Sequence, residues 1–256
     1  MKFNNIINIT YFLILVFCKI NFCFAEDLTI VKIVSCHSPP YFFYEDNKFK
    51  GSEVELLALI FRYMNINYNF YITDCNDAIQ KTKVGYYSIL LHNNINKNDS
   101  SNLLSSDSIF QMNLVFFRKK FDYTQSFLKN ITIGIPSGYS DTNLKKNKNY
   151  HLVSISGNNN YLNALLKVYF NEIDYFLCDQ ITCEYVIDKY KNKFPELNRI
   201  ERRTTQLYEK LSRNAYFSKI SSINKERFYE FNYVLKKIKN TYAYKNILNK
   251  YNIRNN

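Results

Sequence analysis

Residues 29–72 read TIVKIVSCHSPPYFFYEDNKFKGSEVELLALIFRYMNINYNFYI. The first seven of these residues are mostly β-branched, and such a run predicts a buried strand. An apolar stretch with helical spacing follows at 52–64, where Ser52 and Glu55 predict a capping box at the start of the helix. At 68–72, alternating side chains predict a second strand. The order strand, helix, strand predicts a β-α-β unit with parallel strands.

The same alternation is repeated along the rest of the chain. We expect strands at 86–91, 112–118, 131–135, 151–156, 173–178 and 214–218, and helices at 77–83, from about 140, and at 160–170, 180–190, 224–239 and 242–251. Two such series predict two open α/β sheets rather than one. Right-handed crossovers bring the carboxyl ends of parallel strands to one edge, where ligands of open α/β sheets bind. Two facing edges therefore predict a cleft between two lobes.

The composition is that of a folded globular protein. The chain has 256 residues and a mass of 30.6 kDa, which is enough for one large domain or two small ones. Hydrophobic residues make up 46% and charged residues 22%, which excludes disorder throughout. The net charge of +12 comes from Lys and Arg that form no long basic block, so we expect no nucleic-acid partner. Three His without a tight Cys/His grouping predict no metal site, and we expect no cofactor.

The first 25 residues, MKFNNIINITYFLILVFCKINFCFA, have the parts of a secretory signal peptide. Lys2 supplies a positive start, residues 9–18 are apolar, and Cys23 and Ala25 are small residues at the positions that signal peptidase reads. An uncleaved anchor needs roughly 18 apolar residues, and the apolar run here is shorter. We therefore expect cleavage after Ala25 and a soluble protein exported to the periplasm.

Export makes disulfides an expectation for the four cysteines that remain, Cys36, Cys75, Cys178 and Cys183. Four cysteines allow three pairings. Cys36 and Cys75 follow neighbouring predicted strands, and Cys178 and Cys183 flank a strand-to-helix turn, so we expect these two pairs. The alternative is four small buried thiols.

Six segments of the chain carry a resemblance to a known family. They are PPYFFYEDNKFKGSEVELL at 39–57, AIQKTKVGYYSILL at 78–91, IGIPSGYSDTNL at 133–144, NEIDYFLCD at 171–179, AYFSK at 215–219 and KKIKNTYAYKNILNKY at 236–251. In this order they resemble the amino-acid-type extracellular solute-binding proteins, family three, of ABC importers. The resemblance extends over nearly all of the chain that follows the signal peptide.

The resemblance implies a two-lobed periplasmic-binding-protein fold of type II. In that fold, 26–115 with 219–256 form lobe one and 116–218 form lobe two, with a hinge where the chain crosses between them. It also implies a protein that is not an enzyme and that captures a small polar ligand with an amine, such as an amino acid; we expect a monomer by default. Its partner is then an ABC permease in the inner membrane.

Asp179 is the main ligand-binding candidate, because the resemblance places there the carboxylate that receives an α-amino group. A carboxylate at a strand end accepts charge-assisted hydrogen bonds from an ammonium. Asp179 is also suited to cap the helix that follows, and the two roles can coexist. Gly138 and Ser140 open another predicted helix, where free backbone N–H groups favour an anion such as a ligand carboxylate. The alternative for Ser140 is a plain helix cap.

Five further residues are candidates on the side of lobe one. His92, Asn93 and Asn94 follow a predicted strand and lie either in the pocket or in a polar surface loop. Tyr41 is either a wall of the cleft or part of the core. Ser35 stands where some family members carry an Asp at the end of the first strand.

The chain departs from the family at the residue that clamps a ligand α-carboxylate. The family has an Arg there, whereas that register gives Asp99 or Ser100, and no Arg lies between Arg62 and Arg118. We therefore expect an amine without an α-carboxylate, or an amino acid in an altered pose.

Two other functional classes are open. The chain can be a ligand sensor without transport, or a degenerate paralogue that binds nothing. The fold is also used by periplasmic cyclohexadienyl dehydratases, but their chemistry needs a general acid and a clamp for a dicarboxylate. The missing Arg argues against that enzyme.

Overall fold

The computed structural model describes residues 30–93, 95, 101–120, 130–136, 142–157 and 159–253. The expected signal peptide at 1–25 lies outside this range. None of the helices in the described ranges combines the length and the apolar character that a bilayer-crossing helix requires.

The strands and helices alternate along the chain. The strands are β1 (Val31–Ser35), β2 (Phe43–Glu45), β3 (Lys48–Lys50), β4 (Tyr68–Ile72), β5 (Ile89–Asn93), β6 (Leu103–Ser105), β7 (Phe110–Lys119), β8 (Ile131–Pro136), β9 (Tyr150–Ile155), β10 (Tyr175–Asp179) and β11 (Ile200–Ser218). The helices are α2 (Ser52–Met64), α3 (Cys75–Lys83), α4 (Thr142–Lys146), α5 (Asn160–Tyr169), α6 (Gln180–Tyr190), α7 (Ser222–Ile238) and α8 (Tyr242–Lys250), with a 3₁₀ turn η2 at Pro195–Arg199.

The main sheet has the hydrogen-bonded strand order β4-β1-β5-β11-β7-β10-β8-β9, with β6 on β11. β1 pairs in parallel with β4 and β5, and β8 pairs in parallel with β9 and β10, as expected for two β-α-β series. The long antiparallel strands β7 and β11 lie between these two groups. The two expected sheets are thus joined into one hydrogen-bonded path, because β7 and β11 contribute to both.

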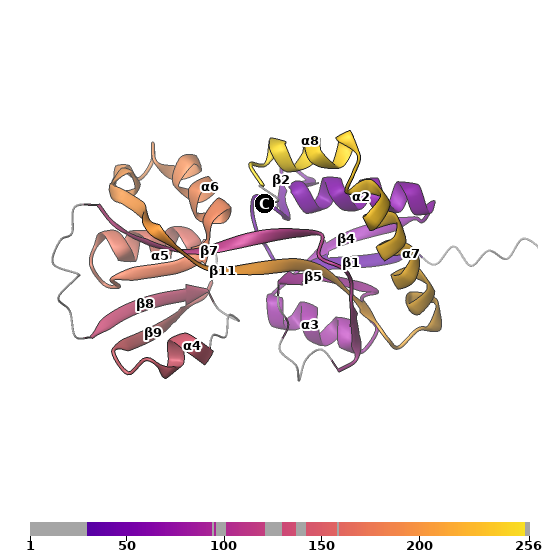
Figure 1. Ribbon diagram of the computed structural model, residues 1–256, viewed down its shortest axis with the longest axis horizontal. Coiled ribbons are helices and arrows are strands. Elements are labelled where there is room, and N and C mark those ends of the chain that lie inside the picture. Colours follow the sequence, from indigo (N-terminus) through magenta and orange to yellow (C-terminus); the bar gives the residue numbers. More distant parts are fainter. Residues whose placement is uncertain are drawn as a thin grey trace, which may run out of the picture.

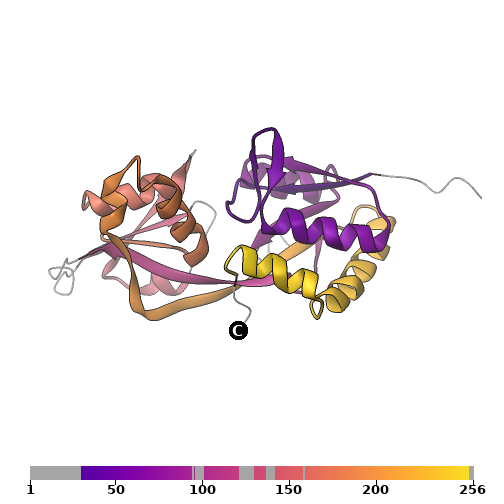
Figure 2. The ribbon, with the colours of Figure 1, turned by 90° about the horizontal axis from the view of Figure 1, so that it is seen from above.

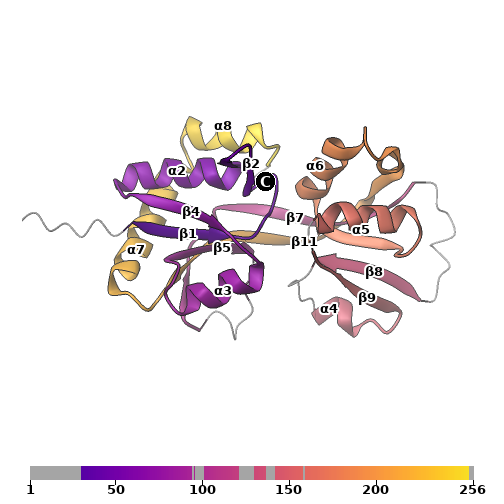
Figure 3. The same cartoon turned by 180° about the vertical axis from the view of Figure 1, so that it is seen from behind.

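The molecule has two lobes, connected by β7 and β11 (Figures 1 and 3). The first lobe contains β1 to β6 with α2, α3, α7 and α8, and the second contains β8 to β10 with α4, α5 and α6. Figure 2 shows the same two bodies from above, with the crossing strands between them. The fold is therefore α/β and two-lobed.

Each lobe has its own apolar core. The first core lies beneath α2 and α7 and includes Ile33, Leu56, Leu57, Phe61, Phe217 and Phe231, all fully buried. The second core lies beneath α5 and α6 and includes Val115, Phe117, Leu165, Val168, Phe176 and Val186. Complete burial of each such side chain contributes about 1.5–3 kcal/mol, so each lobe holds its strand ends in place largely through its own core.

The expected capping box at Ser52 is wrong. The residue that precedes the helix is Gly51, and the buried hydroxyl of Ser52 has no hydrogen-bond partner among the described residues. Glu55 instead accepts a hydrogen bond of 2.6 Å from Lys250 in α8. Gly51 has a φ of 121°, and a Cβ there would lie 2.1 Å from the carbonyl oxygen of Tyr41. The chain that crosses over this position leaves no room for a capping side chain.

Other differences concern elements that need a distant partner. The hairpin of β2 and β3 was not predicted, and neither was β11 before residue 214. Residues 200–213 are mostly polar and form a strand only by pairing with β7. Helix α3 begins at Cys75 rather than at 77, because the Asp74 side chain caps it by accepting a hydrogen bond from the Asn76 amide.

Both expected disulfides are present. Cys36 is bonded to Cys75, with a Cα–Cα distance of 5.0 Å, and joins the end of β1 to the start of α3. Cys178 is bonded to Cys183, with a Cα–Cα distance of 6.6 Å, and joins β10 to α6. The alternative of four free thiols does not hold for this structure.

Candidate functional site

Asp179 is the last residue of β10 and lies where the two lobes meet. Its side chain is buried, and its Oδ2 accepts hydrogen bonds from the Thr182 amide at 2.9 Å and from the Thr182 hydroxyl at 3.0 Å. Asp179 is therefore the N-cap of α6, which is the capping role predicted from the sequence beside ligand binding. The cap uses a single carboxylate oxygen, which leaves the other for a second role.

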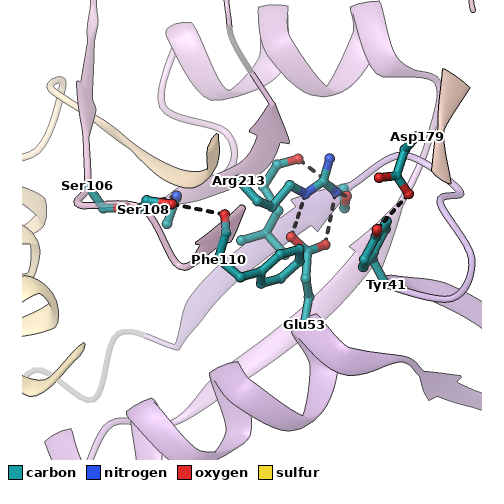
Figure 4. A network of polar contacts seen from close by, with 10 residues as sticks. Tyr41, Glu53, Ser106, Ser108, Phe110, Asp179 and Arg213 are labelled. Atoms are coloured by element: carbon teal, nitrogen blue, oxygen red, sulfur yellow. Dashed lines mark hydrogen bonds and ion pairs between the residues drawn. The ribbon is translucent and has the colours of Figure 1, made fainter. Parts of the chain in front are cut away.

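Tyr41 reaches Asp179 from the first lobe. Its hydroxyl donates a hydrogen bond of 2.6 Å to Asp179 Oδ2, and its ring is stacked on Phe110 with centroids 5.2 Å apart (Figure 4). Burial, and then the nearby Asp179 carboxylate, raise the pKa of Tyr41 well above 10.0, so its hydroxyl remains a donor. Tyr41 is thus part of the core by its ring and part of the site by its hydroxyl.

A buried ion pair lies beside these two residues. Arg213 of β11 donates two hydrogen bonds to the Glu53 carboxylate of α2, one from Nε to Oε1 at 2.5 Å and one from Nη2 to Oε2 at 2.9 Å (Figure 4). Ser35 accepts a hydrogen bond from Arg213 Nη2 at 3.3 Å and donates one to the Leu91 carbonyl at 3.3 Å. The predicted candidate Ser35 therefore positions the guanidinium.

Among the described residues, the buried charges at this place do not balance. Glu53 and Asp179 supply two buried carboxylates, while Arg213, which donates two of its hydrogen bonds to Glu53, supplies one buried cation. Asp179 Oδ1 is buried and has no hydrogen-bond partner among the described residues. Burial raises the pKa of Asp179 above its ordinary value of 3.8, against the hydrogen bonds from Tyr41 and Thr182 and the charge of Arg213. The site is suited to one more cation, presented to Asp179 Oδ1.

Two more contacts join the lobes next to Tyr41. Tyr41, Phe43 and Glu45 are every second residue of an extended segment, so their side chains lie on the same side of it. Each of the three contacts a residue of β10 or α6. The rings of Phe43 and Tyr185 lie 6.2 Å apart, and Lys189 Nζ lies 2.7 Å from Glu45 Oε1. Through these contacts the hairpin and α6 hold the lobes close together on this side.

A cavity of about 580 Å³ opens between the lobes on the side of α3. It is lined by Cys36, His37, Tyr44, Ile72, Thr73, Asp74, Cys75, Asn76, Ser156, Gly157, Asn159 and Asn160. Although the whole chain carries +12, none of the described lining residues is Lys or Arg, and the carboxylate of Asp74 is among them. Burial, and then the charge of Lys189, lower the pKa of His37 below 6.5, so its imidazole is neutral at pH 7. The cavity is polar, rich in amides and hydroxyls, and favourable to a cation.

Tyr161 is a half-buried residue whose pKa responds to the charge of Asp179. Burial, and then the charge of Asp179, raise the pKa of Tyr161 to about 12. Tyr161 directly follows the lining residue Asn160 at the start of α5, so this pKa shift links the cavity wall electrostatically to Asp179.

The remaining candidates are placed only in part. His92 is half-buried on β5, and its main chain pairs with Asn214. The main chain of Asn93 pairs with that of Arg213, while its side chain is not described. Outside the described residues lie Asn94, Asp99, Ser100, Gly138 and Ser140.

Sequence reasoning missed Glu53 and Arg213. The family register places a clamping Arg between Arg62 and Arg118, whereas Arg213 is 160 positions from Glu53. A signal was available in the sequence, because Arg213 stands two residues before the apolar run 215–217, where a lone charge on a central strand needs a buried partner.

A sequence model of the bacterial extracellular solute-binding proteins, family 3, matches residues 30–254. No curated protein sequence is significantly similar to the chain.

Several solved structures have the same fold. The substrate-binding protein of an amino acid ABC transporter is 17% identical, covers 87% of this chain and 98% of its own, and has a TM-score of 0.68. A histidine kinase sensor domain with similarity to periplasmic binding proteins is 15% identical, with coverages of 87% and 96% and a TM-score of 0.68. An ancestral amino acid-binding protein, a precursor of cyclohexadienyl dehydratase, is 15% identical, with coverages of 87% and 94% and a TM-score of 0.65.

Proposed function

Because the chain belongs to the bacterial extracellular solute-binding proteins of family 3, we propose that it captures a small polar ligand with a protonated amine. The observation that carries the proposal is the buried Asp179, whose Oδ1 has no partner among the described residues. An unsatisfied buried charged group costs more than the roughly 1–3 kcal/mol of a neutral one, and an ammonium satisfies it with a charge-assisted hydrogen bond.

The ligand is an amine without an α-carboxylate rather than a standard α-amino acid. A buried guanidinium is present beside Asp179, but the chain's own Glu53 binds it bidentately. A ligand carboxylate that bound Arg213 would have to displace Glu53, which would leave a buried carboxylate without a counterion. The described part of the cavity lining includes Asp74 and holds no Lys or Arg, which supports the same class of ligand.

Capture works by a shift between open and closed arrangements of the lobes. Asp179 and the start of α5 belong to the second lobe, while Tyr41 and the residues around Cys36 and Cys75 belong to the first. A ligand that contacts both sets binds the closed arrangement more tightly and so shifts the equilibrium toward it. The moving bodies in this proposal are 26–115 with 219–256, and 116–218.

The cellular role that we propose is delivery to an ABC permease. The chain is exported by the signal peptide at 1–25, works as a periplasmic monomer and hands its ligand to the permease. A sensor role without transport is the second candidate, because a histidine kinase sensor domain shares the fold over 87% of this chain. Uptake of labelled ligand by cells with and without the gene distinguishes the two roles.

A thermal-shift screen of amines, polyamines and amino acids tests the ligand class. A ligand at 100 times its Kd adds about 2.7 kcal/mol to the free energy of unfolding, which raises Tm by about 5–10 °C for a chain of this size. We expect that shift from at least one amine. A screen in which only carboxylates without an amine raise Tm would contradict the proposal.

Asp179→Asn tests the site. The amide oxygen of Asn can still accept the hydrogen bonds of Thr182 and Tyr41, so we expect the free variant to melt at the wild-type temperature or above it. The negative charge is lost, so the ligand-induced shift should largely vanish. Asp174→Asn is the matched control, because Asp174 lies at the opposite end of β10, where it accepts a hydrogen bond from the Thr132 amide at 2.7 Å. A full ligand shift in Asp179→Asn would show that Asp179 only caps α6.

A further inference from the structure

Two cysteines and a histidine that are far apart in the sequence meet in the first lobe. Cys36 follows β1, Cys75 follows β4 at the start of α3, and His92 lies on β5. The strand order β4-β1-β5 places these three positions side by side at the carboxyl edge of the sheet. Both sulfur atoms and a ring nitrogen of His92 lie within 4.8 Å of one another, and all three residues are half-buried.

Thiolate and imidazole groups in this number are ligands for a thiophilic metal ion. Two Cys and one His hold zinc at catalytic sites in which a fourth position is left for water. In the present structure the two sulfurs are bonded to each other, and a disulfide sulfur lacks the negative charge that makes a thiolate a strong ligand.

We propose that reduction of the Cys36–Cys75 disulfide creates a binding site for one thiophilic metal ion, held by Cys36, Cys75 and His92. A phosphine supplies the two electrons and becomes a phosphine oxide, while water supplies its oxygen and the two protons of the thiols. Zn²⁺ then replaces both thiol protons and takes the neutral imidazole as its third ligand. The disulfide and the metal exclude each other.

The geometry of the site permits this exchange. Zinc–sulfur bonds of about 2.3 Å in a tetrahedral site need the two sulfurs about 3.8 Å apart. The Cα atoms are already 5.0 Å apart, so rotation of the cysteine side chains supplies this separation without moving the strands. Cys75 is the first residue of α3, where the helix dipole stabilises a thiolate.

The cavity between the lobes completes the site. Cys36 and Cys75 both line it, so an ion has a path from solvent and a water molecule has room to serve as the fourth ligand. The second disulfide, Cys178–Cys183, differs from the first in two ways. Both its cysteines are fully buried, and among the described residues they have no nearby His or carboxylate with which they could form a three-ligand metal site. The metal site is therefore specific to the first pair.

Zinc titration of the whole mature protein, oxidised and phosphine-reduced, tests the proposal. We expect one equivalent of Zn²⁺ bound to the reduced protein in competition with a chromophoric chelator, and none bound to the oxidised protein. His92→Asn should weaken the reduced protein's affinity by at least about tenfold, and Cys36→Ser should abolish binding. The double variant Cys178→Ser with Cys183→Ser should still bind one equivalent.

His151→Asn is the matched control, since His151 is exposed on β9 in the second lobe. With Co²⁺ in place of Zn²⁺, thiolate-to-metal charge-transfer absorption should appear in the reduced wild type and be lost in Cys36→Ser. The proposal is overturned by reduced protein that binds no Zn²⁺, by equal affinity of His92→Asn and wild type, or by circular dichroism showing that the reduced protein has unfolded. None of these readouts depends on the amine-binding function.

Discussion

Glu53→Gln is the change that most directly tests the buried ion pair. Glu53 is fully buried, and both its oxygens accept hydrogen bonds from Arg213, which is itself 3% exposed. Gln can accept only one of these two hydrogen bonds and carries no charge. The variant therefore leaves a buried guanidinium without its counterion, which is the costly way to break a buried pair.

The expected loss of stability follows from that arrangement. Removal of one partner of a buried pair costs about 3–5 kcal/mol. At about 2–4 °C per kcal/mol for a chain of this size, Tm should fall by about 6–20 °C. Replacement of both partners, Glu53→Leu with Arg213→Met, should restore most of the loss, because apolar side chains of similar size can fill the same space without a desolvation cost.

Urea unfolding and thermal melts followed by circular dichroism measure these differences. Glu55→Gln is the matched control, since Glu55 lies on the same helix and pairs with the exposed Lys250, and such a surface pair contributes about 0–1 kcal/mol. If Glu53→Gln costs no more than Glu55→Gln, the charge balance on which the ligand class depends is wrong. The same conclusion follows if the double replacement is as unstable as the single one.

Three further predictions concern pH, the first disulfide and specificity. Burial raises the pKa of Asp179, so the stability that its protonation adds is present below pH 3.8 and is lost as the pH rises through the raised pKa. Amine binding should strengthen over that same window in ligand titrations, and weakening there would contradict the assignment. Replacement of both Cys36 and Cys75 by Ser opens a loop with a sequence separation of 39, so the free energy of unfolding measured in urea should fall by about 4 kcal/mol. A fall of less than about 1 kcal/mol would contradict a stabilising role of this disulfide. Finally, Glu53→Gln should bind amines with an α-carboxylate more tightly in calorimetry, because Arg213 can then donate hydrogen bonds to that carboxylate. An unchanged ligand preference would refute the idea that Glu53 keeps ligand carboxylates away from Arg213.

Much of the secondary structure could be predicted from local pattern. Helix α6 begins and ends where the sequence places it, and α2 has the predicted bounds, because capping residues and apolar spacing act within a few residues of the chain. The start of β11 could not be predicted in this way, since residues 200–213 become a strand only by pairing with β7. Ser52 was misread as a cap because the crossing of the chain over Gly51 is invisible in the sequence.

The sequence by itself determined the class of fold, the family and Asp179 as a strand-end carboxylate, and it predicted the two disulfide pairs while leaving free thiols open. Each of these depends on short-range pattern or on the order of segments, which one chain displays directly. Only the tertiary structure decided that Arg213 is bound by Glu53 and that Tyr41 lies against Asp179. It also decided that His92 stands beside Cys36 and Cys75. These groups meet because parallel strands end at a common edge and the two lobes pack together there, and a sequence contains no distance across that edge.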